Sequence, residues 1–204
     1  MSINIINIFI KNPRLGYVKT RLAATLGNEA ALRIYHFLLD KTRAAVVQVH
    51  AKRWLWYSDT IAANDDWDDA HFHKKVQVPG DLGARMYGAF QAAFAEGATK
   101  VIIVGSDCPE LNGALLEQAL EVLEHHDFVI GPTPDGGYYL LGMNHLHQEV
   151  FQDIEWSTDA VYATTAAIIK RLGCTKFDLV PLSDIDNETD WLHYQSRYNL
   201  QDTP

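Results

Sequence analysis

Short apolar runs alternate along the chain with longer stretches in which apolar residues recur at helical spacing. Apolar runs of about four to eight residues indicate strands, and a period of about 3.6 residues indicates amphipathic helices. Their alternation predicts crossover connections and a mostly parallel sheet. The strands are predicted near Asn4–Ile10, Arg53–Tyr57, His71–Gln77, Lys100–Val104, Phe128–Gly131, Tyr138–Gly142 and Lys176–Pro181, and the helices near Glu29–Val49, Leu82–Glu96, Gly113–His125, Asp159–Leu172 and Thr189–Tyr198.

The first two predicted helices carry apolar stripes that indicate buried faces. We interpret these stripes as core, without a functional role: Ala31, Ile34, Tyr35, Leu38 and Leu39, then Met86, Ala89, Phe90 and Ala93. Helices that cover both faces of a parallel sheet give the three-layer α/β/α class. The length of 204 residues suits one such domain, so we predict a single domain over residues 1–204.

The composition, 48% apolar and 21% charged, is that of a soluble globular protein. No run approaches the roughly 18 to 20 apolar residues that span a membrane. The first ten residues alternate like a strand and lack a basic leader, so we expect a cytoplasmic protein. The two cysteines, Cys108 and Cys174, form no C-x-x-C pair and are expected as free thiols.

The net charge of −9 argues against nucleic acid as a partner, because that binding depends on clustered Lys and Arg. The histidines show no zinc-ligand spacing, and Ser106 lacks the surroundings of a nucleophilic serine. The acidic stretch from Asp65 to Asp69 does not match a calcium-binding EF-hand loop and is expected to be a solvated loop. The chemistry is therefore sought at the ends of the strands.

One carboxylate directly follows a buried strand. Val101–Val104 leads into Gly105, Ser106 and Asp107, and open α/β sheets bind ligands at this carboxyl edge. A hard cation such as Mg²⁺ needs only one or two carboxylates, with water and phosphate oxygens completing its coordination. We predict Asp107 as a metal ligand; the alternative is that it caps the turn that follows.

A second strand end leads into Asp135, Gly136, Gly137 and Tyr138. The two glycines permit a ligand to approach the backbone closely. The alternative is a tight hairpin turn between the flanking strands. We predict substrate contacts for this segment, with either Tyr138 or the adjacent Tyr139 facing the pocket.

The loop after the first strand holds four cations in an otherwise acidic chain. They lie between Lys11 and Arg21, with Gly16 among them, and cations plus backbone donors are what phosphate recognition needs. The spacing differs from a P-loop. Lys19 and Arg21 are the preferred phosphate ligands; the alternative is a basic surface loop.

Near the C-terminus, Asp184 and Asp186 alternate in an extended segment, so both could face one cation. Asp186 is preferred as the second metal ligand. Helix capping by Asn187 or Thr189 explains part of the same segment.

Together these motifs resemble the nucleotide-diphospho-sugar transferase superfamily, which has the GT-A-type, Rossmann-like fold. Within it, the chain is most similar to a bacterial glycosyltransferase-like family akin to phospholactate guanylyltransferase and molybdenum-cofactor nucleotidyltransferases. The motifs that carry the resemblance are Lys11-x-Pro13-x-x-Gly16-x-Val18-Lys19-Thr20-Arg21-Leu22, Gly80-Asp81-Leu82-Gly83-x-Arg85-Met86, Gly105-x-Asp107-x-Pro109-x-Leu111, Gly131-Pro132-x-x-Asp135-Gly136-Gly137-Tyr138-Tyr139-Leu140, Trp156-Ser157-Thr158 and Asp184-x-Asp186.

The resemblance implies roles for these positions. Lys19 and Arg21 would hold the nucleotide phosphates, and Asp107 would bind Mg²⁺ or Mn²⁺, with Asp186 as a second ligand. Asp135, with Gly136 and Gly137, would lie on the acceptor or sugar side. The further substrate-binding positions would be Lys11, Gly16, Asp81, Leu82, Gly83, Tyr138 and Trp156.

We therefore expect a metal-dependent glycosyltransferase that uses a nucleoside-diphosphate sugar and a small-molecule acceptor. Lys19 and Arg21 would support the departing diphosphate, and Asp135 is one candidate for the base. Two alternatives remain open: nucleotidyl transfer from a nucleoside triphosphate to a small phosphorylated substrate, and nucleotide binding without turnover.

Overall fold

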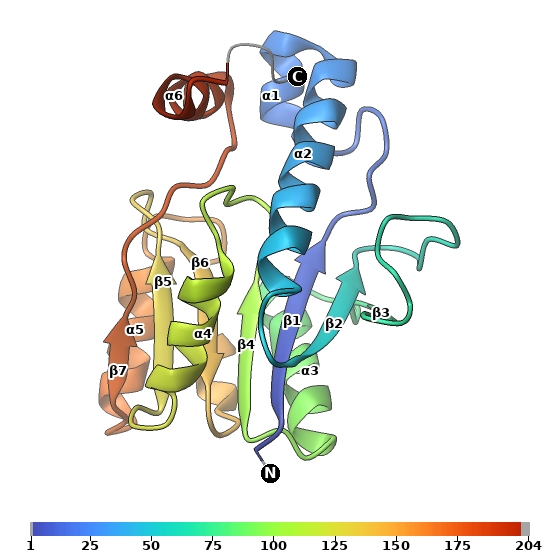
Figure 1. Ribbon diagram of the computed structural model, residues 1–204. Coiled ribbons are helices and arrows are strands. Elements are labelled where there is room, and N and C mark those ends of the chain that lie inside the picture. Colours follow the sequence, from blue (N-terminus) through green and yellow to red (C-terminus); the bar gives the residue numbers. More distant parts are fainter. Residues whose placement is uncertain (1, 201–204) are drawn as a thin grey trace.

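A seven-stranded sheet forms the middle layer of the molecule, with strand order β3-β2-β1-β4-β6-β5-β7 (Figure 1). The computed structural model describes residues 2–200. Neighbouring strands are parallel except at β6, which is antiparallel to both β4 and β5. The strands are β1 (Asn4–Ile10), β2 (Lys52–Tyr57), β3 (His73–Val76), β4 (Lys100–Val104), β5 (Phe128–Pro132), β6 (Tyr138–Met143) and β7 (Lys176–Asp178).

Helices cover both faces of the sheet, which confirms the predicted three-layer α/β fold. α2 (Asn28–Val46) and α4 (Gly113–Val122) lie on one face, and α3 (Leu82–Ala95) and α5 (Val161–Arg171) on the other (Figure 1). The remaining helical elements are α1 (Thr20–Leu26), the short 3-10 helix η1 (Gln148–Phe151) and α6 (Glu188–Tyr198).

Alternation along the strands builds a core on each face of the sheet. In β1, Ile6 and Ile8 face α2 and α4, whereas Ile5 faces α3 and α5, and all three are fully buried. The predicted stripes on α2 and α3 are buried as expected. Trp54 and Trp56 of β2 also lie in the core.

Two predicted strands are shorter than expected, and neither the α-helix α1 nor the 3-10 helix η1 was predicted. The backbone carbonyl of Asp68 accepts the N–H groups of His71 and Phe72, so the chain turns there and β3 begins only at His73. β7 ends at Asp178, although Leu179 still donates to the carbonyl of Ile130. The helix α1 begins at Thr20, at the end of the stretch interpreted as a phosphate loop, and is only seven residues long.

The carboxyl ends of β1, β4, β5 and β7 meet at one edge of the sheet, at the top in Figure 1. Above this edge, α1, the start of α2 and α6 share a small apolar cluster. The cluster consists of Leu22, Ala31, Ile34, Leu38, Ile185, Trp191 and Tyr194. Packing in this cluster places the C-terminal segment over the loops that follow β1 and β4.

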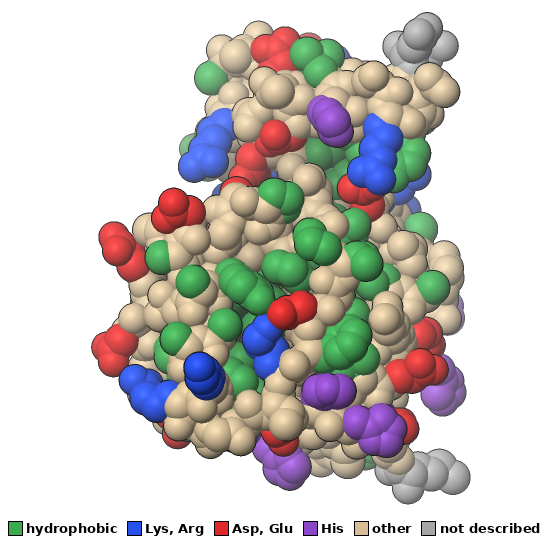
Figure 2. Space-filling model, turned by 90° about the vertical axis from the view of Figure 1, so that its left-hand side faces the viewer, with side chains coloured by type: hydrophobic (Ala, Val, Ile, Leu, Met, Phe, Trp, Pro, Cys, Tyr) green, Lys and Arg blue, Asp and Glu red, His purple; other side chains and the backbone are tan. Residues whose placement is uncertain are grey.

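Figure 2 shows the side of the molecule that lies at the left in Figure 1, where hydrophobic side chains gather around its middle. The edge strand β7 carries an ion pair between Lys176 and Asp178. Charged side chains on an edge strand discourage pairing with other chains. Within residues 2–200, no helix has the length and apolar character needed to cross a bilayer.

Candidate functional site

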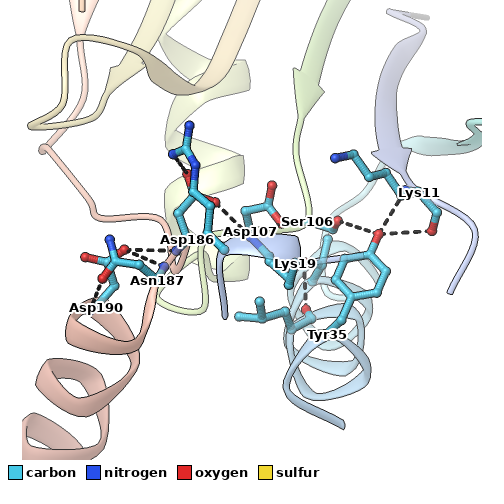
Figure 3. A network of polar contacts seen from close by, with 11 residues as sticks. Lys11, Lys19, Tyr35, Ser106, Asp107, Asp186, Asn187 and Asp190 are labelled. Atoms are coloured by element: carbon cyan, nitrogen blue, oxygen red, sulfur yellow. Dashed lines mark hydrogen bonds and ion pairs between the residues drawn. The ribbon is translucent and has the colours of Figure 1, made fainter. Parts of the chain in front are cut away.

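Three segments distant in the sequence meet at the carboxyl edge of the sheet (Figure 3). Lys19 comes from the loop after β1, Asp107 from the loop after β4, and Asp186 from the segment between β7 and α6. The Lys19 Nζ lies 2.7 Å from Asp107 Oδ1 and 3.1 Å from Asp186 Oδ1. Two predicted metal ligands and one predicted phosphate ligand thus form one cluster, which we call the edge cluster.

The ammonium group of Lys19 is nearly enclosed by this arrangement. Its side chain is only 6% exposed, whereas those of Asp107 and Asp186 are 43% and 42% exposed. Burial lowers the pKa of Lys19, but the carboxylates of Asp107 and Asp186 outweigh burial and hold that pKa above its usual value. Lys19 is therefore cationic at any working pH.

The backbone at Lys19 adopts a conformation that is uncommon for a residue with a side chain. Its φ of 47° and ψ of 49° lie in the left-handed region, directly before α1, and its carbonyl accepts the N–H of Ala23. Such a conformation costs about 1–2 kcal/mol for a non-glycine residue. Strain of this kind concentrates at functional positions.

The segment that carries Asp186 is hydrogen-bonded both to the loop after β4 and to the start of α6. The N–H of Ile185 donates to the carbonyl of Asp107 at 2.9 Å, which joins this segment to the loop after β4. The Asp190 Oδ2 atom accepts the N–H groups of Asp186 and Asn187, and Asn187 Oδ1 accepts the N–H of Asp190. The helix cap proposed as an alternative therefore exists, and it helps to position Asp186.

Asp184 also belongs to this neighbourhood, although the sequence favoured Asp186. Burial, followed by the charge of Asp107, raises the pKa of Asp184 to about 8, while Lys19 lowers it. Asp186 and Asp135 add to the rise. Only the alternation Asp184-x-Asp186 signalled this placement in the sequence.

Tyr35 is a site residue that sequence reasoning missed, because its spacing on α2 marks it only as core. Its hydroxyl accepts the N–H of Lys11 at 2.8 Å and donates to the Lys11 carbonyl at 3.0 Å (Figure 3). The same hydroxyl lies 3.3 Å from Ser106 Oγ. Tyr35 is 2% exposed, so a buried hydroxyl joins the loops after β1 and β4.

The other predicted residues of the first loop lie at its surface. Arg21 Nη1 is 3.8 Å from Asp186 Oδ2, and its side chain is 77% exposed. Lys11 is exposed, and Gly16 has a φ of 80° next to the bond from the Tyr17 N–H to the Arg14 carbonyl. Only Arg21 reaches the edge cluster, through its contact with Asp186.

The segment after β5 forms a turn with hydrogen bonds between residues close in sequence. The Asp135 Oδ1 atom accepts bonds from Thr133 Oγ1 and from the N–H of Gly137. Gly136 has a φ of 88°, and a Cβ there would lie 2.0 Å from the carbonyl oxygen of Asp159. Its neighbour after Gly137, Tyr138, packs against the core beneath α3 and α5. A substrate contact by these four residues stays a prediction.

A separate group forms at the start of α3. Asp81 caps the helix, with its Oδ1 accepting the N–H of Ala84 at 2.8 Å. Trp156 packs onto Gly83, where a Cβ would lie 2.6 Å from the indole Nε1. Leu82 is 42% exposed. The assignment of these residues to substrate binding stays a prediction.

The edge cluster suits a hard divalent cation. Residues 2–200 contain no group of three His, Cys, Asp or Glu side chains arranged to hold a metal ion alone. Mg²⁺ is usually held by one or two carboxylates together with phosphate oxygens and water. Asp107 and Asp186 supply two such carboxylates and already hold a cation, the Lys19 ammonium.

Residues 41–158 match the family described as "Uncharacterized protein conserved in bacteria (DUF2064)". The chain belongs to this family. A crystal structure of a "putative nucleotide-diphospho-sugar transferase" from Desulfovibrio desulfuricans G20 is 32% identical, covers 100% of this chain and 90% of that chain, and has a TM-score of 0.89. The predicted resemblance to the nucleotide-diphospho-sugar transferase superfamily is confirmed. No curated protein matches the chain.

More distant structures share the fold. The 4-diphosphocytidyl-2C-methyl-D-erythritol synthase from Anaerococcus prevotii DSM 20548 is 11% identical, covering 97% of this chain and 96% of that chain, with a TM-score of 0.61. Rv0371C from Mycobacterium tuberculosis H37Rv, in complex with manganese, is 13% identical, covering 93% and 96%, with a TM-score of 0.55. The chain thus shares its fold with this synthase and with Rv0371C.

Proposed function

We propose that this protein transfers a glycosyl group from a nucleoside-diphosphate sugar to a small-molecule acceptor, with a divalent cation. The observation that carries the proposal is the edge cluster, in which Lys19, Asp107 and Asp186 meet at the ligand-binding edge of an α/β sheet. The 32% identical structure, named as a nucleotide-diphospho-sugar transferase, supports the donor class.

Lys19 and Arg21 supply the positive charge that a departing diphosphate needs. Lys19 stays protonated, and Arg21 is exposed at the same carboxylate, so it can turn toward a ligand. Charge-assisted hydrogen bonds from such groups to phosphate are stronger than neutral ones. Preorganised charge directed at the leaving group lowers the barrier without reorganisation.

Asp107 and Asp186 are the residues that would hold Mg²⁺ or Mn²⁺. When bound, such a cation supplies Lewis-acid stabilisation of the charge on the leaving diphosphate. The bond from the Ile185 N–H to the Asp107 carbonyl holds the two carboxylates in register. The manganese complex of a fold relative is consistent with this assignment.

Asp135 is the candidate base for the acceptor hydroxyl. Its exposed carboxylate is held by Thr133 and the Gly137 N–H through one oxygen, Oδ1. A carboxylate oriented in this way could take a proton from a hydroxyl within hydrogen-bond reach. A pH–rate profile that Asp135→Asn leaves unchanged would remove this role.

The deciding experiment separates glycosyl transfer from its two alternatives by its products. The purified protein is incubated with nucleoside-diphosphate sugars or nucleoside triphosphates and candidate acceptors, with Mg²⁺, Mn²⁺ or EDTA. Release of nucleoside diphosphate supports glycosyl transfer, whereas release of pyrophosphate would establish nucleotidyl transfer instead. Metal-dependent nucleotide binding without any product would indicate a binding protein.

Nucleotide binding is measured by the thermal stabilisation of the protein, because a ligand at about a hundred times its Kd stabilises the native state by roughly 2.7 kcal/mol. Asp107→Ala should abolish the metal-dependent part of that stabilisation. The matched control is Glu121→Ala, which removes an exposed acid from α4 and should leave it intact. Equal behaviour of the two variants would contradict the assignment of Asp107.

A further inference from the structure

Lys19 occupies the place between the two carboxylates that would bind a divalent cation. Its Nζ lies within 3.1 Å of oxygens from both Asp107 and Asp186, and its side chain is 6% exposed. Both carboxylates remain more than two-fifths exposed, so a cation from solvent can reach them. Figure 3 shows Lys19 directed toward both acids.

The chain holds Lys19 there against its backbone preference. A lysine with a φ of 47° is strained, and the carbonyl of the same residue begins the hydrogen bonding of α1. The position is fixed from the other side by the bond between the Ile185 N–H and the Asp107 carbonyl. The close ammonium–carboxylate contacts are therefore built into the fold.

We propose that Lys19 is the resident counter-ion of the Asp107–Asp186 pair and competes with the divalent cation for it. Two cations beside the same carboxylates repel each other, and this repulsion is strong where water is partly excluded. A phosphate group offers Lys19 another anionic partner and offers the metal further oxygen ligands. Metal and nucleotide should therefore bind with positive coupling, which is reciprocal.

The role given to phosphate rests on the proposed function, but the competition between Lys19 and the metal does not. A metal added alone meets an occupied carboxylate pair and should bind weakly. Removing the ammonium should leave the same two carboxylates with no internal cation. The metal affinity of the nucleotide-free protein is therefore the direct measure of the competition.

The test is a titration of the nucleotide-free protein with Mn²⁺, in which electron paramagnetic resonance measures the concentration of the free ion. Lys19→Met, which keeps an unbranched side chain one atom shorter and without its charge, should tighten the Kd for Mn²⁺ at least tenfold, which corresponds to about 1.4 kcal/mol. The matched control Arg21→Met removes a charge that is 77% exposed and 3.8 Å from Asp186. It should tighten the Kd less than threefold.

A second substitution guards against misfolding of the first. Lys19→Gly removes the same ammonium at a backbone position that favours glycine, and should tighten Mn²⁺ binding in the same way. Lys19→Arg keeps the charge and should stay within threefold of the original protein. Circular dichroism reports whether each variant is folded.

Either of two results would overturn the inference. One is that folded Lys19→Met and Lys19→Gly bind Mn²⁺ no more tightly than the original protein or Arg21→Met. The other is that no variant binds Mn²⁺. An absence of turnover with every nucleotide sugar would defeat the proposed function while leaving the Mn²⁺ result standing, so the two failures can be told apart.

Discussion

Two parts of the same sheet edge use similar residues in opposite ways. In the edge cluster, Lys19 bonds to Asp186, which lies 167 residues away in the sequence. In the turn after β5, Asp135 bonds to Thr133 and Gly137, each two residues away. Both segments place an acid just after a buried strand, yet one joins distant loops and the other closes a local turn.

The difference shows what an acid at a strand end signals. A local partner satisfies the carboxylate and shapes the backbone, which needs no ligand. A partner supplied by another loop creates a concentration of charge that the fold must hold together. The edge cluster therefore has the stronger claim to a binding role, and the turn after β5 to a positioning or catalytic one.

The largest expected effects are losses of activity in Asp107→Asn and Asp135→Asn, which should differ in whether donor binding is lost as well. Asp107→Asn should abolish both metal-dependent donor binding and transfer, because it removes a carboxylate from the edge cluster. Asp135→Asn should lower kcat by about 10²-fold or more, the usual contribution of a general base, with donor binding within threefold. Parallel measurement of kcat and of thermal stabilisation by the donor checks this. Loss of donor binding in Asp135→Asn would place the turn in the binding site instead.

A substitution in the tight turn after β5 should affect stability. Gly136→Ala combines a φ of 88° with a Cβ placed 2.0 Å from the Asp159 carbonyl oxygen, and should lower the free energy of unfolding by about 3 kcal/mol. The control Gly97→Ala has a φ of 83° and no heavy atom within 4 Å of the added Cβ, so only backbone strain of about 1 kcal/mol applies. Urea denaturation measures both; equal losses would mean that the turn yields easily.

The cross-linking of the loops can be broken at Tyr35. Tyr35→Phe leaves the N–H and carbonyl of Lys11 without their buried partner and should cost about 2 kcal/mol of unfolding free energy. Tyr87→Phe is the control, because its hydroxyl has an exposed 3.4 Å bond from Gln91, and should change stability by less than about 0.5 kcal/mol. Chemical denaturation gives both values. Similar losses would show that the hydroxyl of Tyr35 does not hold the loops.

A change in the pH dependence of stability is expected at Asp184. The pKa of Asp184 is raised to about 8 in the folded protein, so ionising it disfavours the folded state. Its contribution to stability is complete below its unfolded pKa of about 3.9 and is lost as pH rises toward 8.

Asp184→Asn should therefore match the original protein near pH 4 and become increasingly more stable than it as pH rises toward 8, because only the original protein must ionise a buried carboxyl group. Denaturation in EDTA without nucleotide, across this pH range, checks the slope. The matched control Glu121→Gln removes an exposed acid from α4 and is measured over the same pH range. If stability depends on pH in the same way in all three proteins, burial does not disfavour the ionised form of Asp184.

The sequence predicted the layers and most of the elements, because periodic burial is a local property. The strands Asn4–Ile10 and Lys100–Val104 were predicted to the residue. It did not predict α1, whose only buried side chain is Leu22, so its helical period is nearly invisible. The boundaries of β3 and β7 depended on hydrogen bonds from neighbouring turns, which a pattern does not reveal.

The candidate site was predictable in its components but not in its pairing. Asp107 was identified from the strand end that it follows, Lys19 from the cations of the first loop, and Asp186 from the alternation of acids near the C-terminus. Nothing in the sequence indicated that the lysine would lie between the two acids. Tyr35 was assigned only to the core, since its hydroxyl acts through loops far from it in sequence. Single domain organisation and a cytoplasmic location stay predictions.

The bond between Ile185 and the Asp107 carbonyl, with α6 behind it, also bears on the order of synthesis. The chain is made from its N-terminus, so the strands β1 to β7 leave the ribosome before the segment that carries Ile185 and Asp186. Asp186 is synthesised near the end of translation, whereas its partner Lys19 is synthesised near the beginning. A nascent chain therefore completes the edge cluster only when the residues after β7 have been made, and a product truncated after β7 would lack both Asp186 and the side chains of α6 that cover Leu22 and Ile34.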